Sequence, residues 1–360
     1  MALFGKSTAP SLTESIFGSS PDDNPSSNNT LFSKLIPQQE QPQTESRKRP
    51  RTDAKTTPPS PEKAAPETPK QILQRRKRQS QHSVLDQLTI SAQEYQHNGS
   101  DDELYADVRS LMKHHGLVIL RNALSEQDVS TISNIADVTQ RHICDALDAK
   151  KIPYNSSAAD EETFVYSELA VRCKGRMDVR YDENVTATKL PSSLMELVEN
   201  LAACILHGAE PPSLVYSGWI FSHPGSASQP WHTDGSPLFG NSEINGSLPS
   251  YAINVFVGLH DAEEAIVLGP TEFIVGSHQM DPEAVMDTMI ETAVPAVIGK
   301  GDILLYDYRV CHRGTANLSS SLSEDHRETI GVVRKVLYQM YARPWFKEHL
   351  NFGQQSLFDD

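Results

Sequence analysis

Two histidines and one aspartate of this chain form a pattern that could bind a metal ion. His232 and Asp234 are two residues apart, and His312 follows much later in the sequence. Two imidazoles and one carboxylate are the ligand set that holds a non-haem ferrous iron by one face, which leaves coordination positions open for chemistry. In an extended strand, residues i and i+2 project from the same side, so we expect His232 and Asp234 to bind one metal ion while Thr233 points away.

The sequence before His312 predicts how the third ligand is positioned. It opens at a turn-like Gly301-Asp302 pair and continues through strand-forming residues, and Gly314 follows shortly after the histidine. With the two-residue period of a strand, the residues on the same face as His312 are Leu304, Tyr306, Tyr308 and Val310. We therefore expect His312 on a largely apolar, inward side. Taken singly, either histidine could instead be a hydrogen-bonded packing residue.

The first part of the 360-residue chain differs in composition from the rest. Residues 1 to about 80 are crowded with Ser, Thr, Pro, Gln and Asn, as in Thr57-Pro-Pro-Ser-Pro61, and carry no sustained apolar period. Such a segment buries too little apolar surface to offset the entropy of ordering it. We predict a disordered tail over residues 1–90 and one folded domain over residues 91–360, a usual size for a large β domain with helical additions.

Charge is divided in the same way. Residues 1–100 hold 13 Lys+Arg and 10 Asp+Glu, a net of +3, so the remainder of the −15 chain carries −15 − 3 = −18. An acidic domain of this kind is a poor partner for nucleic acid. The tail contains two basic clusters, Arg47-Lys-Arg-Pro-Arg51 and Arg75-Arg-Lys-Arg78, whose spacing suits a nuclear import receptor. A merely solubilising role for the clusters is the alternative.

Cysteine usage and hydropathy indicate a compartment. The four cysteines show no paired spacing, and no apolar leader of signal-peptide type precedes them, so we expect a reducing environment. No apolar run approaches the length that spans a bilayer, and the last residues are not a peroxisomal address. We predict a cytoplasmic or nuclear protein without membrane association, and the basic clusters favour the nucleus.

The expected secondary structure of the folded part changes from helices to strands along the chain. Residues 101–147 have apolar residues at helical spacing, interrupted by a short strand over 117–120, and a second helical pattern covers 191–206. After residue 212, short β-rich runs alternate with turns, over 215–222, 251–259, 272–275, 296–298, 303–311 and 332–341. A helical part (101–210) followed by a strand-rich core (211–346) predicts a mainly β domain with flanking helices, a double-stranded β-helix of jelly-roll or cupin-like type.

The chain resembles the phytanoyl-CoA dioxygenase-like family of iron(II)- and 2-oxoglutarate-dependent oxygenases. The similarity covers most of residues 100–350. Its strongest motifs are Gln229-Pro-Trp-His-Thr-Asp-Gly235, Gly269-Pro-Thr-Glu-Phe-Ile-Val-Gly-Ser-His278, Gly301-Asp-Ile-Leu-Leu-Tyr-Asp307, His312-Arg-Gly-Thr-Ala-Asn317 and Tyr341-Ala-Arg-Pro-Trp-Phe346. The resemblance implies that His232, Asp234 and His312 are the iron ligands.

The resemblance also implies an arginine on a late strand for the distal carboxylate of 2-oxoglutarate. The usual place, about ten residues after the second histidine, is filled here by a polar insertion. Arg327 lies at its edge, whereas Arg334 shares a strand face with Val336 and Tyr338, so we choose Arg334; an internal salt bridge is its alternative role. The other residues that could bind the cosubstrate are Gln229, Thr271 and Asn254, for which ordinary hydrogen bonding is the alternative.

The activity implied by the resemblance is hydroxylation of a C–H bond in a small-molecule substrate with dioxygen. The cosubstrate would leave as succinate and carbon dioxide, and ascorbate is a candidate reductant. Related halogenases lack the carboxylate ligand, so Asp234 argues against halogenation. Three alternatives remain at this point: a family member that binds metal without turnover, a zinc- or manganese-holding cupin-like protein, and a nuclear oxygenase acting on protein or nucleic acid.

Overall fold

The computed structural model describes residues 67–81, 83–92, 101–154, 164–182, 188–235, 237–239, 242–321, 331–348 and 352–359. The basic cluster at 47–51 and the alternative arginine, Arg327, lie outside the described residues, as does most of the segment for which we predicted disorder.

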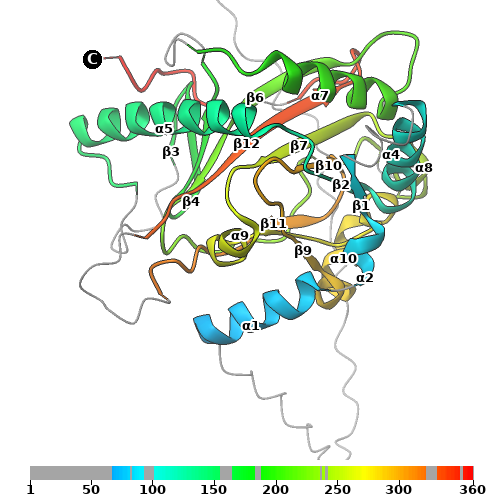
Figure 1. The fold of residues 1–360 in the computed structure, drawn as a ribbon, viewed down its shortest axis with the longest axis horizontal. Coiled ribbons are helices and arrows are strands. Elements are labelled where there is room, and N and C mark those ends of the chain that lie inside the picture. The colour runs from blue at the N-terminus through cyan, green and yellow to red at the C-terminus, as the bar shows by residue number, and fades with distance from the viewer. Residues whose placement is uncertain are drawn as a thin grey trace, which may run out of the picture. The chain divides into compact units, whose positions relative to one another are not determined.

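Two sheets of unequal size form the framework of the described residues (Figure 1). The large sheet has the strand order β1-β2-β10-β7-β12-β6-β5-β4-β3, and the small one the order β11-β8-β9. Neighbouring strands are antiparallel except β1 and β2, which pair in parallel. The strands of the large sheet are β1 (Thr89–Ser91), β2 (Leu117–Arg121), β3 (Phe164–Val165), β4 (Leu169–Cys173), β5 (Arg176–Arg180), β6 (Ser213–Ser222), β7 (Ala252–Gly258), β10 (Ile303–Asp307) and β12 (Arg334–Ala342); those of the small sheet are β8 (Thr271–Phe273), β9 (Val294–Ala296) and β11 (His312–Gly314).

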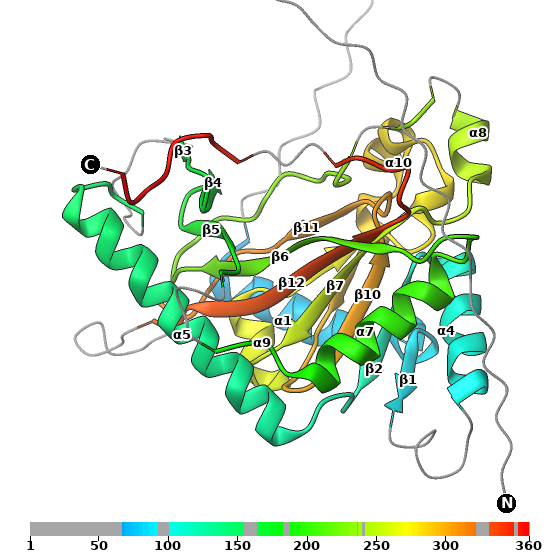
Figure 2. The same cartoon turned by 90° about the horizontal axis from the view of Figure 1, so that it is seen from above.

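Long helices cover one face of the large sheet (Figure 2). Their buried residues, such as Ile132 and Leu194, pack with Val255 and Leu337 of the sheet in one apolar cluster. Ser125 caps the longest of them by accepting from the Asp128 amide. None of the helices in the described ranges is long and apolar enough to cross a membrane. The helices are α1 (Pro69–Ser80), α2 (Ser83–Gln87), α4 (Asp101–His115), α5 (Glu126–Ala149), α7 (Ser192–Ile205), α8 (Ser242–Ser247), α9 (Ala262–Leu268) and α10 (Pro282–Thr288), with 3-10 turns η1 (Ser277–Gln279) and η2 (Ile290–Thr292).

The other face of the large sheet meets the small sheet. Phe256 and Tyr306 of the large sheet share an apolar cluster with Phe273 and Val294 of the small one. The two sheets therefore enclose an interior space between them, and the mainly β fold with flanking helices and a double-stranded β-helix core is confirmed. The large sheet is mixed rather than purely antiparallel because of the parallel β1–β2 pair.

The expectation of one continuous strand from 303 to 311 is wrong. β10 ends at Asp307, and a turn closed by the bond from the Val310 amide to the Asp307 carbonyl leads into β11 of the other sheet. The Asp307 carboxylate accepts from the backbone and guanidinium of Arg309 at 2.9–3.0 Å, all within the buried interior. This buried pair bends the chain, so His312 enters the site from the small sheet.

The expected disorder over residues 69–90 also differs from the structure, which places α1, α2 and β1 there. Thr68 and Gln71 form a capping box at the start of α1, with Pro69 in its first turn. Arg76, from the second basic cluster, is buried and donates to the carbonyls of Ile266 and Ala316. Half of that cluster therefore serves to attach α1 to the domain, because Arg75 also pairs with Glu272.

We expect Arg76→Ala to destabilise the protein, because the carbonyls of Ile266 and Ala316 would lose their buried donors. The expected loss in free energy of unfolding is about 1–3 kcal/mol, measured by urea unfolding of the full-length chain. Lys77→Ala changes the neighbouring, exposed residue of the same helix and should have little effect. Equal stability of the two variants would show that the Arg76 contacts do not stabilise the fold.

His223, at the end of β6, is a buried histidine that favours the neutral form. Its Nε2 atom has no hydrogen-bond partner in the described part of the chain, and its ring meets Tyr154 edge-on at 5.4 Å between centroids. Burial lowers the pKa of His223 to about 4. Folding thus opposes protonation of this side chain.

Acid should therefore destabilise the protein in part through His223. Its pKa is about 4 in the folded chain and about 6.5 in the unfolded chain, so the unfolded state binds the proton first. The contribution of neutral His223 to stability is therefore fully present above about pH 6.5, and it falls as the pH drops from there toward the folded-state pKa of about 4. His223→Phe should reduce the loss of unfolding free energy between about pH 7 and pH 5 by about 2 kcal/mol. His207→Phe, at an exposed histidine, should keep the loss of the unchanged protein.

Candidate metal centre and its cavity

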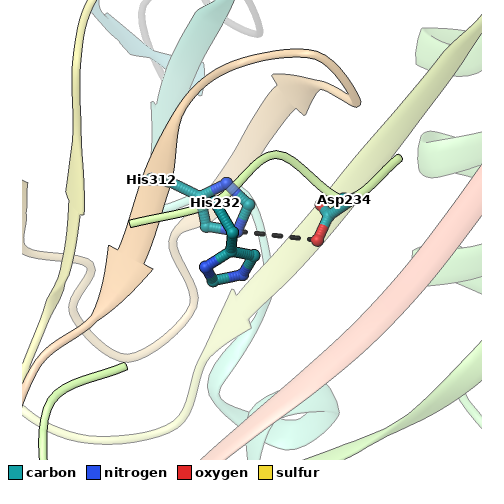
Figure 3. Close-up of side chains that lie close together, drawn as sticks. All are labelled: His232, Asp234 and His312. Carbon is teal, nitrogen blue, oxygen red and sulfur yellow. Dashed lines mark ion pairs between the residues drawn. The ribbon is translucent and has the colours of Figure 1, made fainter. Parts of the chain in front are cut away.

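His232, Asp234 and His312 converge between the two sheets (Figure 3). One ligand atom from each lies within 4.8 Å of those of the other two. The His312 Nε2 atom is 3.7 Å from Asp234 Oδ1, and the two imidazole rings are 4.5 Å apart between centroids. Carboxylate and imidazole atoms at such separations can share one metal ion after small adjustments of the side chains.

The backbone brings the two histidines together. His232 and His312 form an isolated antiparallel bridge, with their amides and carbonyls bonded at 2.9 and 3.0 Å. His232 and Asp234 were expected on a strand, but the segment forms only this one bridge. The bridge replaces a strand as the element that fixes the first ligand.

Both imidazoles are oriented by their own chain. His232 Nδ1 is 2.8 Å from the Pro230 carbonyl and His312 Nδ1 is 3.0 Å from the Val310 carbonyl. Because a carbonyl only accepts, each Nδ1 carries the proton and each Nε2 keeps a lone pair for a metal. Burial is the main cause of a lowered pKa at His312, opposed by the charge of Asp234. The ring is thus held in the neutral form that metal binding needs.

Two donors from the large sheet orient the Asp234 carboxylate. Asn254 Nδ2 and the Tyr306 hydroxyl donate to Oδ2 at 2.5 and 3.2 Å, while Oδ1 is the oxygen nearest to His312. The Tyr308 hydroxyl lies within hydrogen-bond distance of the Asp234 carbonyl, at 2.9 Å. A Cβ atom on Gly235 would lie 2.2 Å from the Tyr308 ring, so only glycine fits after the ligand. Asn254 thus contacts the metal ligand, and its role toward the cosubstrate stays a prediction.

A cavity of about 320 Å³ opens beside the triad. Arg334 lines it, is 5% exposed, and has only a long contact of 3.5 Å to the Thr271 hydroxyl. Within the described ranges no carboxylate pairs with Arg334. Burial, and then the charges of Arg176 and Arg76, lower the pKa of Arg334 to about 9. A buried guanidinium without a counter-charge, facing a cavity, is suited to bind an anion.

Arg176, which was not among the predicted site residues, supplies a second buried cation at this cavity. Arg176 on β5 and Arg334 on β12 both lie opposite Ser222 of β6, so the register places them in one row across the sheet. Arg176 donates to the Thr315 carbonyl at 2.9 Å, and its Nε has no partner in the described structure. The alternation of Arg176, Asp178 and Arg180 along a strand was the sequence signal for this inward face.

The remaining predicted residues also line this cavity. Gln229 accepts from the Gly314 amide at 3.0 Å, and Thr271 lies on β8 opposite Gly314. A Cβ atom on Gly314 would be 2.5 Å from both Arg176 Nη1 and Gln229 Oε1. The absence of a side chain at Gly314 thus makes room for both Arg176 and Gln229. The roles of Gln229 and Thr271 toward a cosubstrate stay predictions.

A family model described as phytanoyl-CoA dioxygenase (PhyH) matches residues 112–323, more than half of the chain. The matched region contains all three proposed metal ligands. The chain belongs to this family. Membership, together with the His-Asp-His set, supports iron and 2-oxoglutarate as cofactor and cosubstrate and an oxygenase in the general sense.

Solved structures with a similar fold are more distant. AviO1 from Streptomyces viridochromogenes Tue57 is 19% identical with a TM-score of 0.44, covering 68% of this chain and 97% of that one. The non-heme alpha ketoglutarate dependent epimerase SnoN from nogalamycin biosynthesis is 16% identical with a TM-score of 0.41, covering 67% and 82%. The carbocyclase SnoK from the same biosynthesis is 15% identical with a TM-score of 0.41, covering 68% and 85%. A search of curated proteins gave no match.

Tyr306→Phe should weaken metal binding, because the Asp234 carboxylate would lose one of the donors that orient it. We expect a roughly 10-fold weaker affinity for Mn²⁺ or Fe²⁺, measured by calorimetric titration. Tyr341→Phe is the matched control: it also removes a buried hydroxyl, but one without a hydrogen-bond partner in the described structure. A similar change in both variants would mean that the Tyr306 hydroxyl does not act through Asp234.

Proposed function

We propose that this chain hydroxylates a C–H bond of a small molecule, using iron(II), 2-oxoglutarate and dioxygen and releasing succinate and carbon dioxide. The observation that carries the proposal is the buried guanidinium of Arg334, which faces the same cavity as the metal triad and has no acidic partner among the described residues. A dicarboxylate that reaches both the metal and Arg334 would supply the missing counter-charge.

The residues of the cavity fit iron and the cosubstrate. His232, Asp234 and His312 would hold the metal, and the Arg334 fork would bind the distal carboxylate, with Arg176 adding positive charge in the same row. Once bound, the metal and the keto acid supply the oxidising chemistry. The chain's part is to fix both in place and to keep water out. The buried rings of Tyr306 and Phe256 and the partly buried ring of Tyr338 line the cavity and serve that end.

Two features disfavour the alternatives considered from the sequence. A zinc or manganese cupin-like protein gives no reason for the unpaired Arg334 near the metal site. An oxygenase directed at nucleic acid would need a positive outer surface, whereas the domain is acidic and the second basic cluster partly faces inward through Arg76. A cavity of about 320 Å³ suits a small molecule.

Anaerobic addition of ferrous iron and 2-oxoglutarate to the full-length protein should produce a weak visible charge-transfer band. Arg334→Ala should raise the 2-oxoglutarate concentration at half-maximal absorbance by about 10- to 100-fold, since a charge-assisted pair is lost. Arg141→Ala removes an exposed arginine on α5 and should leave the titration unchanged. No band in the unchanged protein, or the same titration in both variants, would count against the proposal.

The reaction type needs a separate measurement. Succinate release would be followed against a panel of small metabolites, and the product formed under isotopically labelled dioxygen would be weighed by mass spectrometry. Hydroxylation predicts one labelled oxygen atom in the product. A product without added oxygen would reject hydroxylation while leaving the oxygenase assignment intact.

A further inference from the structure

The cavity beside the metal triad has opposite charges in its two parts. Arg334 and Arg176 line its buried part and are each 5% exposed. Two carboxylates outside the metal site, Asp178 and Glu348, line the same cavity and are partly exposed. Asp178 and Glu348 are therefore more accessible to solvent than the two arginines.

The strand register separates the two parts. Arg176, Ser222 and Arg334 form one row across β5, β6 and β12, and Asp178, Ile220 and Val336 form the next. Tyr338 lies one row further, at a position where the neighbouring strand carries Gly218. Successive rows on one face are about 7 Å apart along a strand. Asp178 thus lies beyond the arginines in the direction of Tyr338, whereas Glu348 follows β12 and is placed by its contact with the Tyr308 hydroxyl.

Tyrosine hydroxyls hold both carboxylates. Tyr216 donates to Asp178 Oδ1 at 2.8 Å. The Tyr308 hydroxyl contacts Glu348 Oε2 as well as the Asp234 carbonyl, and its single proton can be donated to only one of them at a time. The Tyr216 ring reaches Asp178 by lying across Gly218, where a Cβ atom would be 2.2 Å from its hydroxyl oxygen. Glu348 has acceptor capacity beyond one tyrosine donor, since a carboxylate offers about four acceptor sites. Arg180, the next inward position of β5, lies over the Phe352 ring at 4.6 Å and does not line this cavity.

We propose that the outer part of the cavity binds a protonated amine of the substrate through Glu348 and Asp178, with Tyr338 and Tyr308 against its carbon frame. The inference rests on the proposed function, because it places the cosubstrate in the arginine-lined part and the substrate in the acidic part. The strongly acidic domain agrees with a cationic substrate, since its field raises the local concentration of cations. Substrates rich in phosphate or carboxylate are disfavoured by the same charges.

The test uses two probes of nearly equal shape, phenethylamine and its neutral analogue 2-phenylethanol, titrated into metal-free full-length protein by saturation-transfer difference NMR. The amine should bind roughly 10-fold more tightly than the alcohol. Glu348→Gln should abolish that preference, and Asp178→Asn should reduce it. Glu210→Gln, which neutralises an exposed carboxylate outside the cavity, should preserve it.

Equal affinities of the two probes, absence of saturable amine binding, or a preference that survives in both Glu348→Gln and Asp178→Asn would overturn the inference. Tighter binding of the alcohol would instead indicate a neutral, hydroxyl-bearing substrate. The titration contains neither iron nor 2-oxoglutarate, so its outcome is independent of the charge-transfer band. An amine preference without a band rejects the proposed function alone, whereas a band without the preference rejects the amine subsite alone.

Discussion

The backbone bridge between His232 and His312 is the interaction on which the site depends. It joins a loop after the large sheet's β6 to the first residue of β11 in the small sheet, and it does so through paired hydrogen bonds of 2.9 and 3.0 Å. Without it, the two imidazoles would be attached to separate layers whose spacing is set only by apolar packing. Because the bridge is made by the ligands' own backbones, the separation of the rings follows from local geometry.

The buried charges of the site are held in place by the chain at a cost in desolvation. Arg76, Arg176 and Arg334 are all buried, and burial is the first cause of the lowered pKa of each. Arg76 and Arg176 bond to backbone carbonyls, whereas Arg334 has only its long contact to Thr271 in the described structure. Unpaired buried cations destabilise a fold. Arg176 and Arg334 line one cavity, and the anionic cosubstrate proposed above would offset this cost there.

Sequence patterns predicted the parts of this fold that depend on regular periodicity. The helices over 101–147 and 191–206 and the strands around 215–222 and 251–259 lie close to their expected places, because long amphipathic or buried segments have strong periods. The metal triad was predictable from residue types and spacing. The strand face of Arg334 was also predictable, since Val336 and Tyr338 follow it at the period of a strand and line the same cavity.

Other features could not be predicted because tertiary contacts decide them. The turn after Asp307 depends on the buried ion pair between Asp307 and Arg309. In the sequence, these two residues look like the middle of one continuous strand. Arg176 was not among the predicted site residues, because the alternation of Arg176, Asp178 and Arg180 marks a shared strand face but does not show which layer covers that face. α1 was missed because its polar composition outweighed its capping box, Thr68 to Gln71, which was a readable signal.

The N-terminal helix bears on the site through a chain of charged contacts. Arg75 of α1 pairs with Glu272 of β8, and Glu272 pairs with Arg313, which is adjacent to the ligand His312. Glu272 is 2% exposed, so its charge needs both partners. If Arg75 were lost, Arg313 would be the only ion-pair partner left to Glu272 among the described residues. Arg313 lies on β11, the strand that carries the ligand His312. The basic cluster at 75–78 is thus tied to the alignment of β8 with β11, and a boundary drawn at residue 90 would cut through the scaffold of the metal site.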